Sequence, residues 1–198
     1  QLTLKGEPYH KSKHHYKQAA TIGLDIGPST AGIATEVGGV LVELAPECVR
    51  DERKVRRFQR YLDRSRRATN PECYDEQGRC IARPKHKSKR YVHAQAQLAE
   101  VERRLAAKRK IAHNALVHSI LEHGTEIYTE KLSMKAWQRG LFGKSLGKRA
   151  PGQFLARLKQ QTEQAGGHYY ELPTWTLKLS QLCHGCGTYQ KKKMMGPH

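Results

Sequence analysis

Two acidic residues stand in or at the end of apolar segments, where a carboxylate can reach a metal ion. Asp25 lies in TIGLDIGPSTAGIA, an apolar and β-branched stretch with a Gly-Pro-Ser-Thr turn. Glu130 lies in EIYTEKLSMKAW, at the end of a second apolar stretch. Carboxylate oxygens are ligands that Mg²⁺ prefers, and two of them on separate strands can hold one ion between them. Asp25 and Glu130 are therefore candidates for a divalent-metal site.

Each carboxylate also has a simpler interpretation. An aspartate can cap a strand and its turn, and a lone glutamate at a strand end is usually solvated. The D-x-G hairpin around Asp25 is in addition similar to the one with which sugar-kinase and actin-type ATPases hold ATP phosphates. The local motif thus leaves a nuclease and a kinase open.

Five cysteines occur, and an odd number with one tight C-x-x-C is not typical of a secreted disulfide framework. A reducing compartment is the better expectation. Cys183 and Cys186, in C-H-G-C-G, have the spacing of one half of a tetrahedral zinc site. A redox pair is the alternative, but no thioredoxin-like βαβ pattern surrounds it. Cys73 and Cys80 carry little weight as further ligands, and we expect Cys48 to be buried.

The charge balance points to a polyanionic partner. The chain of 198 residues contains 36 Lys and Arg against 18 Asp and Glu, a net charge of +18. Such a balance is typical of proteins that bind nucleic acid and not of an acidic-surface enzyme. Apolar residues make up 37%, which permits a core in one domain with a small appendage. No apolar run is long enough for a transmembrane helix, and residues 1–20 contain no secretory signal.

Much of this charge is concentrated in residues 50–67, where nine of eighteen residues are Lys or Arg. Val55, Phe58 and Leu62 recur at helical spacing, which predicts a helix with a narrow apolar stripe and a broad cationic face. The stripe favours core packing for Phe58 and Tyr61 over stacking on bases. We expect the cations to contact phosphates. The candidate nucleic-acid-binding residues here and in the next basic stretch are Arg53, Lys54, Arg56, Arg57, Arg60, Arg64, Arg66, Arg67, Lys87, Lys89 and Arg90.

The elements that must position these residues alternate between strands and helices. Hydrophobic periodicity and turn residues predict three antiparallel strands within 21–45, with a hairpin turn at Gly38 and Gly39. A turn-rich loop runs to Pro84, and a Gly- and Lys-rich loop covers 139–152. The remaining expected elements are helices at 50–67, 91–122 and 151–165 and strands at 126–132 and 168–174.

Four motifs in this order resemble the insertion-sequence TnpB/OrfB family of RNA-guided DNA nucleases, which are related to the type V CRISPR effectors. GLDIGPSTAGIA is similar to the first RuvC motif, and IYTEKLSMKAW to the family's E-x-L segment. QRYLDRSRRATNPECYD resembles the arginine-rich helix, and LSQLCHGCG the first half of the zinc ribbon. The resemblance covers roughly residues 18–190.

The resemblance implies an α/β fold with a ribonuclease H-like (RuvC) sheet, a basic helical insertion at about 50–122 and a partial zinc ribbon. Residues 1–20 would end an N-terminal wedge-like segment. Residues 21–178 would form the nuclease core, and residues 179–198 the first half of the ribbon.

The function implied is transposon-associated, RNA-guided cleavage of DNA by phosphodiester hydrolysis that depends on Mg²⁺ or Mn²⁺. Asp25 and Glu130 would be catalytic residues that hold this metal, and Cys183 and Cys186 would hold Zn²⁺ as a half site. Guide RNA and target DNA would be the partners, with no membrane involved. The location would be the prokaryotic cytoplasm, in association with the nucleoid.

The sequence also departs from the family pattern. A second C-x-x-C and a third RuvC aspartate in an R-D-x-x-x-A stretch do not occur in it, and Leu179 stands where threonine is usual. We therefore expect a fragment that is truncated at both ends and inactive in cleavage as it stands. The alternatives are a non-catalytic RNA- or DNA-binding remnant and, with less support, an actin-like-fold kinase.

Overall fold

The computed structural model describes residues 20–139, 142–178, 181–183 and 185–189. The expected wedge-like segment therefore lies outside the described residues except for Ala20, as does much of the expected half ribbon, Leu179 included. The chain forms two compact units, one of residues 1–44 with 113–198 and the other of residues 45–112. The second unit spans most of the interval in which the sequence predicts a helical insertion, and each unit is described by itself.

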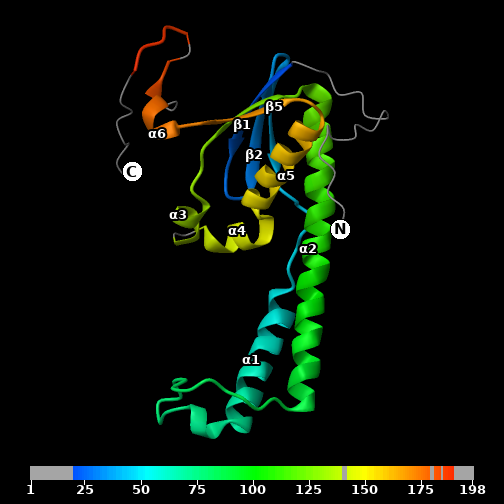
Figure 1. Ribbon diagram of the computed structural model, residues 1–198, viewed down its shortest axis with the longest axis vertical. Coiled ribbons are helices and arrows are strands. Elements are labelled where there is room, and N and C mark those ends of the chain that lie inside the picture. The colour runs from blue at the N-terminus through cyan, green and yellow to red at the C-terminus, as the bar shows by residue number, and fades with distance from the viewer. Residues whose placement is uncertain (1–19, 140–141, 179–180, 184, 190–198) are drawn as a thin grey trace, which may run out of the picture. The chain divides into compact units, whose positions relative to one another are not determined.

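The first unit is built on a five-stranded mixed sheet, so its fold is mixed α/β (Figure 1). The strand order is β3-β2-β1-β4-β5, in which β1 pairs antiparallel with β2 and β2 with β3. On its other side β1 pairs parallel with β4, which pairs parallel with β5. The strands are β1 (Thr21–Ile26), β2 (Thr30–Thr35), β3 (Gly38–Glu43), β4 (Glu126–Glu130) and β5 (His168–Leu172). All five strands expected from the sequence are therefore confirmed.

The hairpin turn between β2 and β3 lies two residues earlier than predicted. Thr35 pairs with Gly38, so residues 36–37 form the turn and the two glycines begin β3. Gly38 has φ +144°, a conformation that side chains disfavour, and this explains why glycine stands at the first position after the turn. The glycine pair therefore belongs to a hairpin, as the sequence predicts, but it follows the turn.

The core of the first unit lies on one face of the sheet. Ile22, Leu24 and Ile26 of β1 alternate with Gly23 and Asp25, and only the former three are buried in the core. Two helices cover them, α2 (Lys89–His123) with its C-terminal part and α5 (Pro151–Gln164), which crosses the sheet in Figure 1. The core residues of these helices are Val117, Ile120, Leu121, Phe154 and Leu158. Asp25 therefore belongs to the face that these helices leave open.

Helix α5 has the bounds expected from its sequence. Pro151 occupies its first turn, where a missing N–H costs nothing, and Gly166 follows its end with φ +79°. Phe154, Leu158 and Thr162 recur every four residues and are all buried. Each full burial of a side chain the size of Phe154 or Leu158 contributes about 1.5–3 kcal/mol.

The segment expected as a loop at 139–152 contains helical turns instead. Helix α3 (Met134–Arg139) precedes it, and α4 (Gly143–Arg149) lies within it, so that expectation was wrong. The reason is that Leu146 buries its side chain, a tertiary contact that outweighs the low helix propensity of Gly143 and Gly147. Ala150 in the left-handed region, with φ 47°, separates α4 from α5. A short helix, α6 (Thr174–Leu177), follows β5.

The second unit contains α1 (Glu52–Thr69), the short 3₁₀ helix η1 (Pro71–Cys73) and the N-terminal part of α2. Asp51 caps α1 by accepting a hydrogen bond from the backbone N–H of Lys54 at 2.9 Å. Helix α1 ends before Asn70 because Pro71 disfavours helical backbone at the residue that precedes it. Both helices confirm the sequence expectation within a few residues. In the described part of the chain, no helix has the length and apolar character that crossing a membrane requires.

Candidate active site and nucleic-acid interface

The sheet brings Asp25 and Glu130 together from distant parts of the sequence. In the parallel pairing of β1 and β4, Leu24 lies opposite Thr129, so Asp25 and Glu130 occupy the next position of the register. Leu24 and Thr129 are buried on the core face. Because successive side chains alternate between the faces, Asp25 and Glu130 both lie on the open face. Neighbouring strands are about 4.8 Å apart, which places the two carboxyl groups within reach of one ion.

The electrostatics of this pair favour a bound cation. Burial raises the pKa of the half-buried Glu130 carboxyl, and the negative charge of Asp25 raises it further. Among the residues that the structure describes, neither carboxylate forms an ion pair with a lysine, arginine or histidine. The charge of the pair is therefore not compensated within the described chain, as expected for ligands of a divalent ion.

A hollow of about 550 Å³ opens over the two carboxylates. Asp25 and Glu130 both line it, and the floor beside them is made by Gly23 and Gly32, which add no side chain. Gly32 pairs directly with Asp25 across β1 and β2, and a Cβ at Gly32 would lie 3.7 Å from the Asp25 Cβ. Glycines at these positions keep the space next to Asp25 free for a ligand.

An aromatic pair borders the carboxylates on the same face, and the sequence analysis missed it. The rings of Tyr128 and Tyr170 stack with their centroids 4.7 Å apart. Next along β5, the ring of His168 stacks on Tyr170 at 6.0 Å, and its Nδ1 lies 2.8 Å from a carboxylate oxygen of Glu126. Tyr128 precedes Glu130 by two residues, so the period of two along β4 was the signal that could have placed it on this face.

A third metal ligand is not among the residues that lie together here. Within the described ranges, no three side chains of His, Cys, Asp or Glu gather in one group suited to a metal ion. The fold thus brings together Asp25 and Glu130, the two carboxylates of the predicted metal site.

The second unit contains a basic groove of about 740 Å³ between α1 and the start of α2, which we call the α1–α2 groove. It is lined by five of the eleven cationic residues predicted to bind nucleic acid, together with two aromatic side chains and three further residues. The lining residues are Lys54, Arg57, Phe58, Tyr61, Arg64, Lys89, Arg90, His93, Ala94 and Gln97. The structure therefore places cations from two separate sequence segments around one space.

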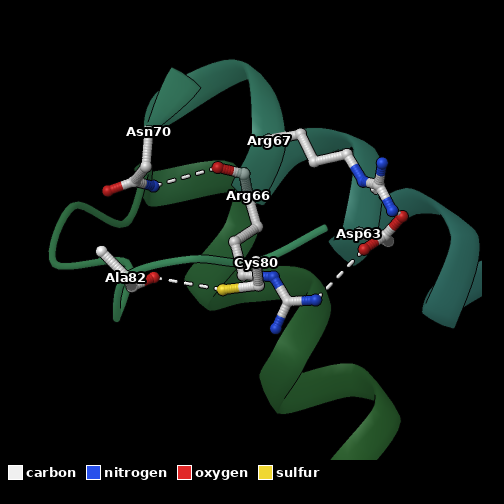
Figure 2. A network of polar contacts seen from close by, with 6 residues as sticks. All are labelled: Asp63, Arg66, Arg67, Asn70, Cys80 and Ala82. Carbon is white, nitrogen blue, oxygen red and sulfur yellow. Dashed lines mark hydrogen bonds and ion pairs between the residues drawn. The ribbon is translucent and has the colours of Figure 1, made fainter. Parts of the chain in front are cut away.

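The other predicted cations lie outside this groove. Arg66 and Arg67 both bind Asp63 on the same helix, at 3.1 and 3.0 Å (Figure 2). The ammonium of Lys87 lies over the Tyr91 ring, 6.0 Å from its centroid. Three more are exposed and do not line the groove, namely Arg53, Arg56 and Arg60.

Asn70 holds the segment that leads into α2 against the end of α1, a role that nothing in the sequence reading indicated. Its side chain is fully buried and donates to the carbonyls of Arg66 at 3.0 Å and His86 at 2.9 Å (Figure 2 shows the first). Its side-chain oxygen accepts from the backbone N–H groups of Lys85 at 3.1 Å and His86 at 2.8 Å. Four bonds to one buried amide fix the approach of Lys89 and Arg90 to the groove.

Cys183 and Cys186, the predicted half site for zinc, lie between Leu182 and Tyr189, which form an antiparallel bridge. The backbone N–H of Gly187 donates to the Cys183 carbonyl at 2.8 Å, and that of Cys183 donates to the Thr188 carbonyl at 2.9 Å. Hydrogen bonds from Thr188 and from Cys183 lower the pKa of the exposed Cys186 thiol. A lowered pKa favours the thiolate, which is the form that binds zinc. His184, between the two thiols, lies outside the described residues.

The other cysteines belong to the second unit. Cys48 is 2% exposed, which confirms the expected buried position. Cys73 is also buried, and burial raises the pKa of its thiol. Cys80 is exposed, and its thiol donates to the carbonyl of Ala82 at 3.1 Å (Figure 2).

No protein-family model matches the sequence, and no curated protein matches it either. We therefore infer the function from the residues of the two sites and from their geometry.

Proposed function

We propose that this chain belongs to a transposon-associated, RNA-guided DNA endonuclease of the TnpB/OrfB type that depends on Mg²⁺ or Mn²⁺. The observation that carries the proposal is the pairing of Asp25 and Glu130 at one register position and on one open face of neighbouring parallel strands. Guide RNA and target DNA would be its partners, in the prokaryotic cytoplasm near the nucleoid.

Further features support a ribonuclease H-like interpretation of the sheet. Such nucleases draw their acidic residues from separate strands, and here the first strand neighbours the fourth. The cationic helices lie in the sequence between the strands of Asp25 and Glu130. The hairpin of Cys183 and Cys186, with its lowered thiol pKa, supports the proposed zinc half site.

The residues present fit a divalent ion on chemical grounds. Asp25 and Glu130 supply hard oxygen ligands, and a bound cation would offset the repulsion that raises the pKa of Glu130. When bound, Mg²⁺ would polarise a phosphodiester and lower the pKa of a water molecule. The chain itself contributes the two carboxyl groups and the glycine floor that admits a phosphate beside Asp25.

The metal site can be tested with Tb³⁺, whose emission is sensitised by a nearby tyrosine. Tyr128 lies two residues before Glu130 on the same face and is the sensitiser. We expect emission on titration with Tb³⁺ and its loss on competition with Mn²⁺ or excess Mg²⁺. Asp25→Asn and Glu130→Gln should each weaken binding at least tenfold. Glu126→Gln is the matched control, because it removes an acid from the same strand that is paired with His168. Equal emission from all variants would overturn the metal site.

The activity is tested on the protein loaded with its guide RNA and offered a supercoiled plasmid in Mg²⁺. We expect no guide-dependent cleavage by residues 1–198 alone, because the third carboxylate of the family pattern does not occur in this sequence. When a segment that carries the second C-x-x-C and the R-D motif is supplied, cleavage should require the guide. It should then disappear with Asp25→Ala or Glu130→Ala, while Glu126→Ala retains it. Guide-dependent cleavage that survives Asp25→Ala would show that the reaction uses other residues.

A second candidate function is RNA or DNA binding without catalysis. It is favoured by the α1–α2 groove, which lies in a compact unit that contains neither carboxylate. The two functions differ in their metal dependence. A binding protein would hold RNA equally well in EDTA and would leave the plasmid intact with every variant.

A further inference from the structure

The α1–α2 groove combines positive charge with aromatic surface and contains no acidic lining residue. Its cations are Lys54, Arg57, Arg64, Lys89 and Arg90, and its aromatic side chains are Phe58 and Tyr61. A surface that binds phosphates alone needs only the cations. Aromatic rings within a cationic groove are instead typical of sites for unpaired nucleotides, because every base has a face on which a ring can stack.

The sequence predicts core packing for Phe58 and Tyr61, but in the structure both side chains are only partly buried. Val55, one turn earlier, is 1% exposed, whereas Phe58 and Tyr61 are only half-buried and line the groove. Within the described residues, no hydrogen bond involves the Tyr61 hydroxyl. The rings therefore offer apolar surface to a ligand. Of the residues that line the groove, Ala94 of α2 is the buried one.

Two rings lie between cations along one face of α1. Lys54, Arg57, Phe58, Tyr61 and Arg64 follow one another at intervals of three or four residues, apart from the adjacent Arg57 and Phe58. Residues at these intervals are neighbours on a helix surface, about 5–6 Å apart. One nucleotide can therefore place its base on a ring and its phosphate against a cation one turn away.

The groove charge is also available. In the described part of the chain, no carboxylate pairs with Lys54, Arg57 or Arg64. Arg66 and Arg67, outside the groove, are by contrast both bound to Asp63. Lys54, Arg57 and Arg64 can therefore bind phosphates without first breaking an ion pair.

We propose that the α1–α2 groove binds an unpaired RNA segment, with a base stacked on Tyr61 and the flanking phosphates on Arg57 and Arg64. The choice of RNA rests on the proposed function and on His93 and Gln97. Both side chains line the groove, with Gln97 Nε2 3.1 Å from His93 Nε2, and they offer hydrogen-bonding groups to a ribose 2′-hydroxyl. The volume of about 740 Å³ is that of a site for a small ligand. Duplex bases, already stacked on one another, could not use Tyr61.

The charge requirement is tested with two double variants of equal net charge on the same helix. Arg57→Gln with Arg64→Gln removes groove cations, and Arg53→Gln with Arg60→Gln removes exposed cations outside it. Binding of a labelled single-stranded RNA 12-mer is measured by fluorescence anisotropy in EDTA. We expect Kd to rise at least tenfold for the groove variant and no more than threefold for the control. Equal losses would overturn the groove as the site.

The stacking requirement is tested at Tyr61. Tyr61→Phe keeps the ring and should bind RNA as the unchanged protein does, whereas Tyr61→Leu keeps apolar packing and should lose about 5- to 100-fold. Circular dichroism checks that both variants are folded. Single-stranded DNA and duplex RNA of the same sequence should bind at least fivefold more weakly. Unchanged affinity in Tyr61→Leu, or DNA bound as tightly as RNA, would refute the proposal.

RNA binding by the α1–α2 groove and DNA cleavage are tested by separate measurements. RNA binding in EDTA reports on the groove alone, and cleavage in Mg²⁺ reports on Asp25 and Glu130. Loss of Tyr61 dependence with intact guide-dependent cleavage would remove this inference and leave the proposed function standing. Tyr61-dependent RNA binding without any cleavage, even when the segment with the R-D motif is supplied, would support the groove as an RNA site and contradict the proposed nuclease function.

Discussion

The carboxylates of Asp25 and Glu130 share one open face of β1 and β4, and the charge of Asp25 adds to burial in raising the pKa of Glu130. A carboxyl group whose pKa is higher in the folded than in the unfolded chain binds more protons when folded. Stability therefore falls as the pH rises through the interval between the two values, because the fold disfavours the ionised form of Glu130.

We accordingly expect Glu130→Gln to stabilise the metal-free protein at pH 7, because it removes a half-buried charge next to Asp25. The gain in the free energy of unfolding, measured by urea titration, should vanish at a pH below the pKa of an unfolded glutamate. A variant that is destabilised at pH 7 would show that Glu130 has a compensating partner. Glu126→Gln, which loses the bond to His168, should not be stabilised.

The affinity for metal should rise with pH, whereas the stability of the metal-free protein should fall. A cation binds the ionised carboxylates, so Mn²⁺ affinity should increase as the pH rises through the raised pKa of Glu130 and then level off. Isothermal titration calorimetry in two buffers of different ionisation enthalpy would detect the released proton. In Glu130→Gln, the increase of Mn²⁺ affinity over the pH interval in which Glu130 loses its proton should disappear.

The buried amide of Asn70 should be the most sensitive polar position of the second unit. Asn70→Ala leaves two carbonyls and two N–H groups without partners, which costs about 1–3 kcal/mol or more. Asn70→Asp should cost more at neutral pH, because a carboxylate oxygen would then face the carbonyls of Arg66 and His86. Urea unfolding as a function of pH checks this order, and the Asp variant should recover in part at acidic pH. Equal stability of both variants with the unchanged protein would contradict the geometry.

Reversal of charge on α1 tests the electrostatic part of RNA binding. Replacing Arg56, Arg57, Arg60 and Arg64 with glutamate should weaken RNA binding by several orders of magnitude. Arg57 and Arg64 line the groove, so their loss removes phosphate contacts, and the new carboxylates at positions 56 and 60 add repulsion of the RNA phosphates. The slope of log Kd against log salt concentration should decrease at the same time. The fold should persist, because these four side chains are exposed and lie off the stripe of Val55. Unchanged affinity in a folded variant would exclude α1 as the binding surface.

The cysteines should differ in reactivity in a defined order. Cys186 is exposed and has a lowered pKa, so iodoacetamide should modify it first and at a lower pH than an ordinary thiol. Cys73 is buried with a raised pKa and should react last in the native protein. Mass spectrometry of peptides after timed alkylation gives this order. Added Zn²⁺ should protect Cys183 and Cys186 and leave the rate at Cys80 unchanged.

The sequence by itself determined the local elements and the candidate residues. Alternation in TIGLDI and the four-residue recurrence of Phe154, Leu158 and Thr162 are properties of short segments, so strands and helices were predictable from them. The same holds for the spacing of Cys183 and Cys186 and for the accumulation of arginine on α1. Where a local rule had a tertiary competitor, it failed, as at 139–152, where burial of Leu146 outweighs the glycines.

Only the tertiary structure decided which of these residues meet. The parallel register of β1 and β4 places Glu130 beside Asp25 and brings Tyr128 to the same face, and register is a property of two strands that the sequence of neither contains. The hydrogen bonds of Asn70 to Lys85 and His86 likewise join segments separated by the turn-rich loop. Long-range pairing of this kind depends on which surfaces are buried together, and local sequence patterns carry no record of that choice.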